Sequence, residues 1–146
     1  MSIDTAISLV DFEWSSDGDF VIRKGDLSDT YDSTGKGFVQ ECEDRIKSEQ
    51  FDWKLLPTKG ANLIDFFGEN NTEKTRKTIE EIIKTSLTED GFLDSSDVSV
   101  YAAPLSSTEI VVRVDIDTQG IEEIPDSEII IKIVYDLQGQ GPFILR

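Results

Sequence analysis

The spacing of apolar residues changes along the chain, from a helical period to the alternating period of β-strands. Residues 36–48 place Phe38, Cys42 and Ile46 on one narrow face, with Val39 as an alternative neighbour of Ile46. This spacing predicts an amphipathic helix. Its remaining surface is expected to carry the charged residues Glu41, Glu43, Asp44, Arg45 and Lys47.

Two more helices are predicted after the first. Residues 62–67 form a short one, and Gly68 closes it because glycine tolerates the left-handed geometry of helix ends. Residues 72–88 form the strongest one, and Phe92 and Leu93 are expected to return to the core behind it. Its cap is one of Asn70, Asn71 and Thr72, and its apolar stripe consists of Ile79, Ile82, Ile83 and Leu87.

The last third of the chain alternates between apolar and polar residues. Residues 98–102, 109–117 and 128–137 therefore predict three strands of an antiparallel meander with one buried face. The inward positions are Ile110, Val112, Val114, Ile116, Ile129, Ile131, Ile133 and Tyr135.

Two further strand candidates lie near the N-terminus. Residues 9–14 and 19–23 fit a hairpin joined by residues 15–18, and Lys24-Gly25-Asp26 ends the second strand.

These elements predict an α+β fold, in which the meander packs against about three α-helices. A single domain is expected over residues 9–137. Residues 1–8 are expected to be flexible, and residues 138–146 form a C-terminal tail or arm.

An aromatic and acidic segment follows the first helix. It holds Phe51 and Trp53 and ends at Pro57, because the residue before a proline avoids helical geometry. The two aromatic side chains are either an anchor for a partner or part of the core over the helix at residues 72–88. We favour the core.

The net charge of the chain limits which classes of partner are expected. The chain has 146 residues, of which 30 are acidic and 14 basic, and its formal net charge is -16. Nucleic acids and anionic membranes are therefore not expected as partners, because both need clustered Lys and Arg. A protein partner would present a basic or neutral surface.

Few residues are available for catalysis or metal binding. The chain has no histidine, and its one cysteine, Cys42, lies on the apolar side of a helix and is expected to be a core residue. No metal, cofactor, disulfide, signal peptide or membrane span is expected, which predicts a soluble protein of a reducing cytoplasm. The acidic loop with Asp26, Asp29 and Asp32 lacks the spacing of an EF-hand and leaves only a loose ion site open.

Carboxylate pairs for sugar hydrolysis can be nominated, such as Glu41 with Asp52 or Glu49 with Asp65. Nothing in the sequence selects one pair among so many acidic residues. No catalytic residue is assigned, and the chain is not expected to be an enzyme.

The order of the predicted elements resembles the small baseplate wedge proteins of contractile-tailed phages. These proteins are also called sheath initiators or lysozyme-like wedge proteins, and the type VI secretion baseplate subunit TssE is related to them. The resemblance covers residues 9–120. It is carried by Asp11-Phe12, Gly18-Asp19-Phe20, Gln40, Pro57-Thr58-Lys59-Gly60, residues 63–67, residues 72–88 and the strands from Val98 onward.

Two departures from the family pattern matter. The family often has Glu-Pro-Arg after the long helix, where this chain has Asp90-Gly91-Phe92-Leu93-Asp94, so the wedge contact through that motif is not carried over. Residues 128–146 also extend past the usual end of the family.

The resemblance implies a structural protein of the virion tail baseplate, present in the host cytoplasm during assembly. Its implied partners are the tail sheath protein, the wedge core proteins, and tail tube or hub proteins, with six copies per baseplate. The implied mechanism is strand pairing with the first ring of sheath subunits, since an exposed sheet edge can bind a strand of another chain.

Residues 109–117 and 128–137 are the expected sheet edges. The candidate contact residues are Val111, Arg113, Asp115, Ile130, Lys132 and Val134, together with Phe143, Ile144 and Leu145 of a tail that is either a donated arm or frayed. Two alternatives stay open: a peptidoglycan-degrading hydrolase, and an acidic adaptor that binds one host protein.

Overall fold

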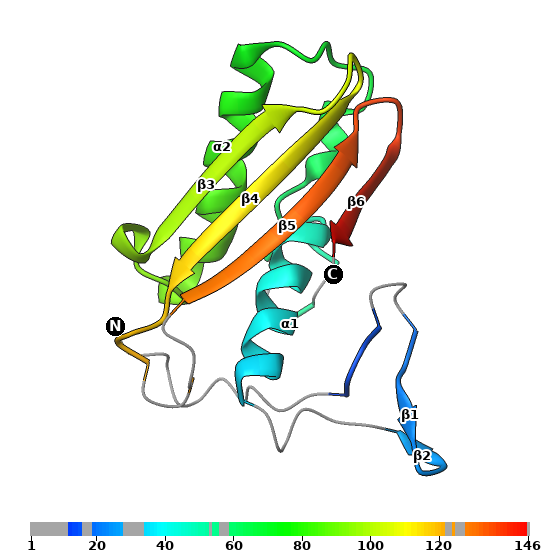
Figure 1. The fold of residues 1–146 in the computed structure, drawn as a ribbon, viewed down its shortest axis with the longest axis vertical. Coiled ribbons are helices and arrows are strands. Elements are labelled where there is room, and N and C mark those ends of the chain that lie inside the picture. Colours follow the sequence, from blue (N-terminus) through cyan, green and yellow to red (C-terminus); the bar gives the residue numbers. More distant parts are fainter. Residues whose placement is uncertain are drawn as a thin grey trace.

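The fold is α+β, as the sequence predicts. In the described part of the chain, two α-helices lie against one face of a four-stranded antiparallel sheet, and a small hairpin stands apart from it (Figure 1). The computed structural model describes residues 12–15, 19–27, 34–52, 54, 55, 59–121, 124 and 128–145. The predictions for residues 1–8, Asp29, Asp32, Trp53, Pro57 and Thr58 lie outside these ranges.

The predicted meander is confirmed and has one strand more than expected. Its order along the sheet is β3 (Val98–Pro104), β4 (Glu109–Asp117), β5 (Glu128–Asp136) and β6 (Gln140–Leu145). The predicted inward side chains of β4 and β5 are at most 8 % exposed. Alternation at a period of two residues therefore identified the buried face correctly.

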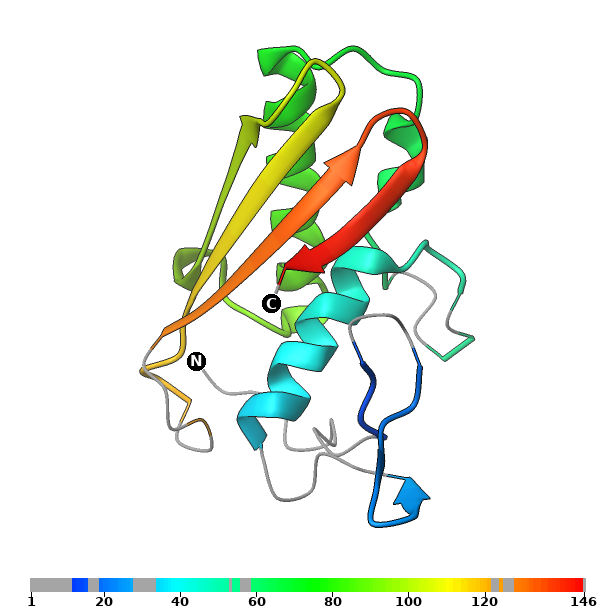
Figure 2. The ribbon, with the colours of Figure 1, turned by 45° about the vertical axis from the view of Figure 1, so that its right-hand side comes forward.

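The core lies between this inner face and the two helices. In α1 (Thr34–Lys47), Phe38, Cys42 and Ile46 are fully buried, as their spacing predicts. In α2 (Glu73–Thr88) the apolar stripe is buried except for Ile82, which is partly covered. Figures 1 and 2 show both helices on the same side of the sheet.

The ends of α2 follow the sequence signals closely. Of the three candidate caps, Thr72 is the one used, because its side-chain oxygen accepts a hydrogen bond from the Thr75 backbone N–H at 3.2 Å. Phe92 and Leu93 return to the core, where each is at most 2 % exposed.

The predicted short second helix is a single 3₁₀ turn, η1 (Leu63–Phe66), so the described chain has two α-helices where about three were expected. Asn62 before it is left-handed, with φ 52°, and Phe67 after it is extended. Helical geometry is therefore interrupted at both ends, and only Leu63 of the turn is buried. Gly68 has the expected positive φ of 90°.

The N-terminal hairpin prediction is correct in part. Trp14 and Phe20 form an antiparallel bridge, as expected for strands on either side of residues 15–18. The predicted break at Lys24 and Gly25 is instead the turn of a second hairpin, between β1 (Ile22–Arg23) and β2 (Asp26–Leu27). Both turn residues have positive φ, which suits the twist of a two-residue hairpin.

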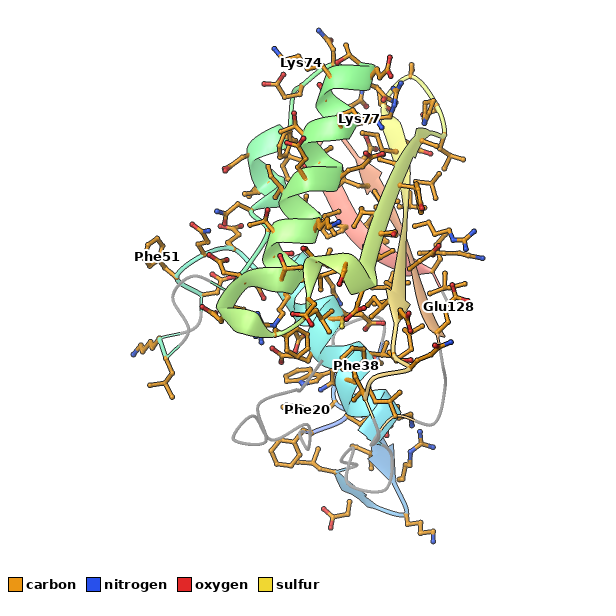
Figure 3. All side chains as sticks on the ribbon, turned by 90° about the vertical axis from the view of Figure 1, so that its left-hand side faces the viewer. Phe20, Phe38, Phe51, Lys74, Lys77 and Glu128 are labelled. Carbon is orange, nitrogen blue, oxygen red and sulfur yellow. The ribbon has the colours of Figure 1, made fainter. Side chains whose placement is uncertain are left out.

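Three predictions about burial are wrong. Phe51 is 78 % exposed and points away from the molecule (Figure 3), so it does not cover α2. Its φ is 72°, in the left-handed region. Glu43 and Arg45, both assigned to the solvated side of α1, are 6 % and 1 % exposed. Arg45 is buried because Glu41 and the Phe92 ring supply favourable contacts for its charge.

The C-terminal residues are not a free tail. Residues 140–145 form β6, which pairs with β5 from Lys132 to Asp136. The tail was not recognised as a strand because Gly139, Gly141 and Pro142 interrupt its apolar pattern.

Candidate partner-binding surfaces

The outer face of the sheet is left uncovered by the described helices, and we call it the open face. Residues directly opposite each other in the register share a face. The open face is therefore formed by Ser99, Tyr101 and Ala103 of β3, Val111, Arg113 and Asp115 of β4, Ile130, Lys132 and Val134 of β5, and Phe143 and Leu145 of β6. In Figure 3 Glu128, which also alternates outward, points away from the helices.

Six of the predicted contact residues lie side by side on this face. Across β4 and β5, Val111 is opposite Val134, Arg113 is opposite Lys132, and Asp115 is opposite Ile130. The sequence alone placed them on two strands. The register brings them into three adjacent rows of one surface.

Strand β6 extends two of these rows. Phe143 lies opposite Val134, and Leu145 lies opposite Lys132; they are 54 % and 48 % exposed. Ile144 lies opposite Ile133, on the inner face, where it packs against the core. Ile144 therefore lies on the opposite face of the sheet from its two neighbours.

The predicted sheet edges are wrong. Strands β4 and β5 are the interior strands, and the edges are β3 and β6. The edge of β3 is partly closed, because the Glu80 carboxylate of α2 accepts a hydrogen bond from the Ala102 backbone N–H at 2.8 Å. Because the Ala102 N–H already donates to Glu80, it is not available to pair with a strand of another chain.

The other edge of the sheet is formed by β6. The last described pair of β5 and β6 is Lys132 with Leu145, and among the described residues no strand pairs with residues 128–131 of β5 on that side. A hollow of about 560 Å³ lies there, between α1 and the ends of the two strands. It is lined by Val39, Glu43, Ile130, Ile131, Lys132, Ile144 and Leu145.

The open face carries two cations near its centre. Arg113 donates from Nε to Asp115 at 2.6 Å, and this hydrogen bond and the carboxylate charge raise the pKa of the guanidinium. Lys132 makes no ion pair with any described residue. One row beside these cations is apolar and consists of Val111, Val134 and Phe143, and adjoining exposed apolar side chains can mark a protein-binding surface.

A second exposed surface was missed by the sequence analysis. Phe12, Trp14 and Phe20 form an aromatic cluster, with ring centroids 4.2 Å apart for Trp14 and Phe20 and 5.8 Å apart for Phe12 and Phe20. The alternation Phe12-Glu13-Trp14 was the available signal, but residues 9–14 were interpreted only as one strand of a hairpin.

Gln40 joins this cluster to α1. Its side-chain amide accepts from the Trp14 backbone N–H at 3.0 Å and donates to the Phe12 carbonyl at 2.8 Å. Phe12 thus contacts both Gln40, through its backbone carbonyl, and Phe20, through its ring.

The groups first considered for chemistry have structural roles. Burial raises the pKa of the Cys42 thiol strongly, which disfavours its nucleophilic thiolate. Glu41 binds Arg45 and Lys59, and Asp52 accepts a hydrogen bond from the Glu49 backbone N–H at 2.9 Å.

No set of three or more metal-ligating side chains gathers among the described residues. Within the same part of the chain, neither α-helix is long and apolar enough to cross a membrane.

Comparison with protein-family models, with curated proteins and with solved structures finds no match to this chain.

Proposed function

We propose that this chain is a structural component of a contractile-tail baseplate, which binds the wedge core and initiates sheath assembly through strand pairing. The family resemblance motivates this role. The observation that supports it best is the hollow beside the last described pair of β5 and β6, Lys132 and Leu145, because its lining includes the exposed apolar side chains of Ile130 and Leu145.

Strand pairing at this position follows from backbone chemistry. An edge strand presents N–H and C=O groups that a strand of another chain can satisfy, and alternate side chains then select the partner. The partner strand would continue the line of β6 and cover Ile130, which is 44 % exposed. The wedge core would contact the remaining open face around Tyr101 and Arg113.

The experiment is co-purification of the chain with its cognate sheath and wedge core proteins. We expect a complex with the unmodified chain and loss of sheath binding in Ile130→Lys and Leu145→Lys, whose side chains line the hollow. Tyr101→Lys is the matched control, since Tyr101 is at least as exposed but lies on the far strand β3. It should retain sheath binding.

Normal sheath assembly in the absence of this chain would overturn the proposal, and so would equal binding by all three variants. Clearing of peptidoglycan that is lost on one Glu or Asp substitution would support a hydrolase instead.

A further inference from the structure

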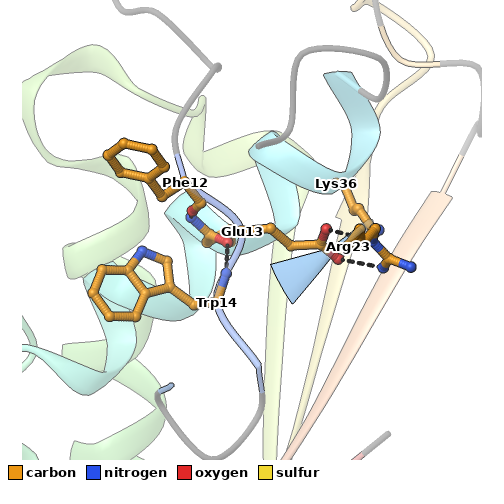
Figure 4. Close-up of polar contacts among 6 residues, drawn as sticks. Phe12, Glu13, Trp14, Arg23 and Lys36 are labelled. Carbon is orange, nitrogen blue, oxygen red and sulfur yellow. Dashed lines mark hydrogen bonds and ion pairs between the residues drawn. The ribbon is translucent and has the colours of Figure 1, made fainter. Parts of the chain in front are cut away.

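The segment at residues 12–14 has the opposite polarity to an ordinary surface strand. Its charged residue, Glu13, is only 8 % exposed, whereas Phe12 and Trp14 on either side are 49 % and 37 % exposed. Figure 4 shows the Glu13 side chain directed toward Arg23 and Lys36, with the two aromatic rings on the other side. The acidic side is thus held inside and the aromatic side faces out.

Several contacts fix this orientation. The Glu13 carboxylate lies 3.0 Å from Arg23 Nη2 and 2.6 Å from Lys36 Nζ. The two hydrogen bonds of Gln40 hold the backbone on either side of Glu13. Burying a carboxylate is costly unless it is paired, and these partners come from both β1 and α1. The exposed rings are therefore presented by a supported segment.

Phe20 completes the presented surface. It is 48 % exposed, stacks on Trp14 and meets Phe12 edge to face, so three rings form one contiguous apolar patch. Contiguous aromatic patches of this kind mark interaction sites, because aromatic anchors dominate binding energy at protein interfaces.

The charge of the chain favours a cationic partner. The formal net charge is -16, and Asp19, next to Phe20 in the sequence, is exposed. The aromatic faces and the net negative charge both attract cations, and arginine stacks on aromatic rings better than lysine. The same negative field disfavours nucleic acids and anionic lipids.

We propose that the aromatic cluster is a docking surface for a basic segment of a partner protein, in which arginine stacks on the exposed rings and flanking apolar side chains cover the remainder. This inference is independent of the baseplate role, which rests on the sheet edge. A negative result for one of the two proposals would therefore not contradict the other.

The test uses Trp14 fluorescence in the full chain carrying Trp53→Phe, because the chain has two tryptophans. The probe is a short synthetic peptide of alternating arginine and leucine, compared with the same peptide carrying neutral citrulline. We expect the arginine peptide to bind at least about tenfold more tightly and to change the Trp14 emission.

Variants separate the cluster from the general negative charge. Phe12→Ser and Phe20→Ser should weaken binding by about tenfold, whereas Phe143→Ser, an exposed phenylalanine on the sheet, should leave it unchanged. Phe20→Leu keeps an apolar side chain without a ring, and it should reduce the preference for arginine over citrulline. Circular dichroism checks that each variant is folded.

Equal affinity of all folded variants would show attraction to the net charge alone and would overturn the proposal. Equal affinity for the two peptides would contradict the role of the arginine charge. Absence of binding would overturn the whole proposal.

Discussion

Gly60 lies in the segment between α1 and η1, against the backbone that directly follows α1. Its φ is +135°, and a Cβ atom there would lie 2.6 Å from the Ser48 carbonyl oxygen. The adjoining Ala61 N–H donates to that same oxygen at 3.0 Å, so the two segments cannot separate without losing a hydrogen bond. Glycine is required here for both its backbone freedom and its small size.

Gly60→Ala is therefore predicted to lower the free energy of unfolding by about 2–4 kcal/mol. The control is Gly35→Ala in α1, where a Cβ would meet nothing within 4 Å. That change should be neutral or stabilise by up to about 1 kcal/mol, because alanine favours helix. Urea unfolding of both variants measures the difference, and equal stabilities would contradict the steric argument.

Glu41 is the acidic partner of two buried cations. Its oxygens lie 2.9 Å from Arg45 Nε and 3.1 Å from Lys59 Nζ, and the two basic side chains are 1 % and 4 % exposed. Among the described residues Arg45 Nη1 has no hydrogen-bond partner, and the guanidinium carbon lies 4.2 Å from the centre of the Phe92 ring. The charge of Arg45 therefore depends strongly on the Glu41 carboxylate.

Glu41→Ala should cost about 3 kcal/mol of stability, since removing one partner leaves buried charge less compensated. Lys77→Ala is the comparison, because it removes an ion pair to Glu80 from a lysine that is 65 % exposed. It should cost less than about 1 kcal/mol. Thermal unfolding of the two variants at one pH tests this, and a cost for Glu41→Ala as small as that for Lys77→Ala would refute it.

At the scale of the elements, α2 protects one sheet edge through a single side chain. Glu80→Ala should leave the Ala102 N–H without its acceptor, so hydrogen exchange at this amide should accelerate and stability should fall by about 1 kcal/mol. Glu81→Ala changes the next residue of α2, which is exposed, and should leave that amide protected. Unchanged exchange in Glu80→Ala would mean that the edge is closed by other contacts.

The sequence predicted those elements whose signal is local. Periodicity identified the buried faces of α1, α2, β4 and β5, because each face repeats along one segment. Strand order is a tertiary property, so the same pattern could not show that β4 and β5 lie inside the sheet.

The candidate surfaces were predictable to the same extent. Alternation grouped Val111, Arg113 and Asp115 on one side of a strand, but only the register placed Ile130 and Lys132 opposite them. The aromatic cluster was missed because burial of Glu13 depends on Arg23 and Lys36, which come from other elements. Arg45 was misplaced for the same reason: its partners lie on an adjacent turn and on another segment.

At the scale of the whole molecule, the net charge of -16 opposes folding. A compact chain brings its carboxylates closer together than an unfolded chain does, so repulsion lowers the free energy of unfolding at low salt. Salt also weakens the exposed ion pairs, but these contribute little, and the pair of Glu41 with the buried Arg45 is screened less. Reduced repulsion should therefore be the larger effect.

We accordingly expect the midpoint of thermal unfolding to rise when sodium chloride is increased from about 20 mM to about 500 mM, where the screening length falls well below 10 Å. The charge reversal Glu81→Lys, at an exposed site on α2, should raise the midpoint at low salt and make the rise with salt smaller. A fall of the midpoint with salt in the unmodified chain would show that attractive ion pairs outweigh the repulsion. A salt response unchanged by Glu81→Lys would show that the rise comes from solvent effects of the salt on apolar burial, since these do not depend on the charge of the protein.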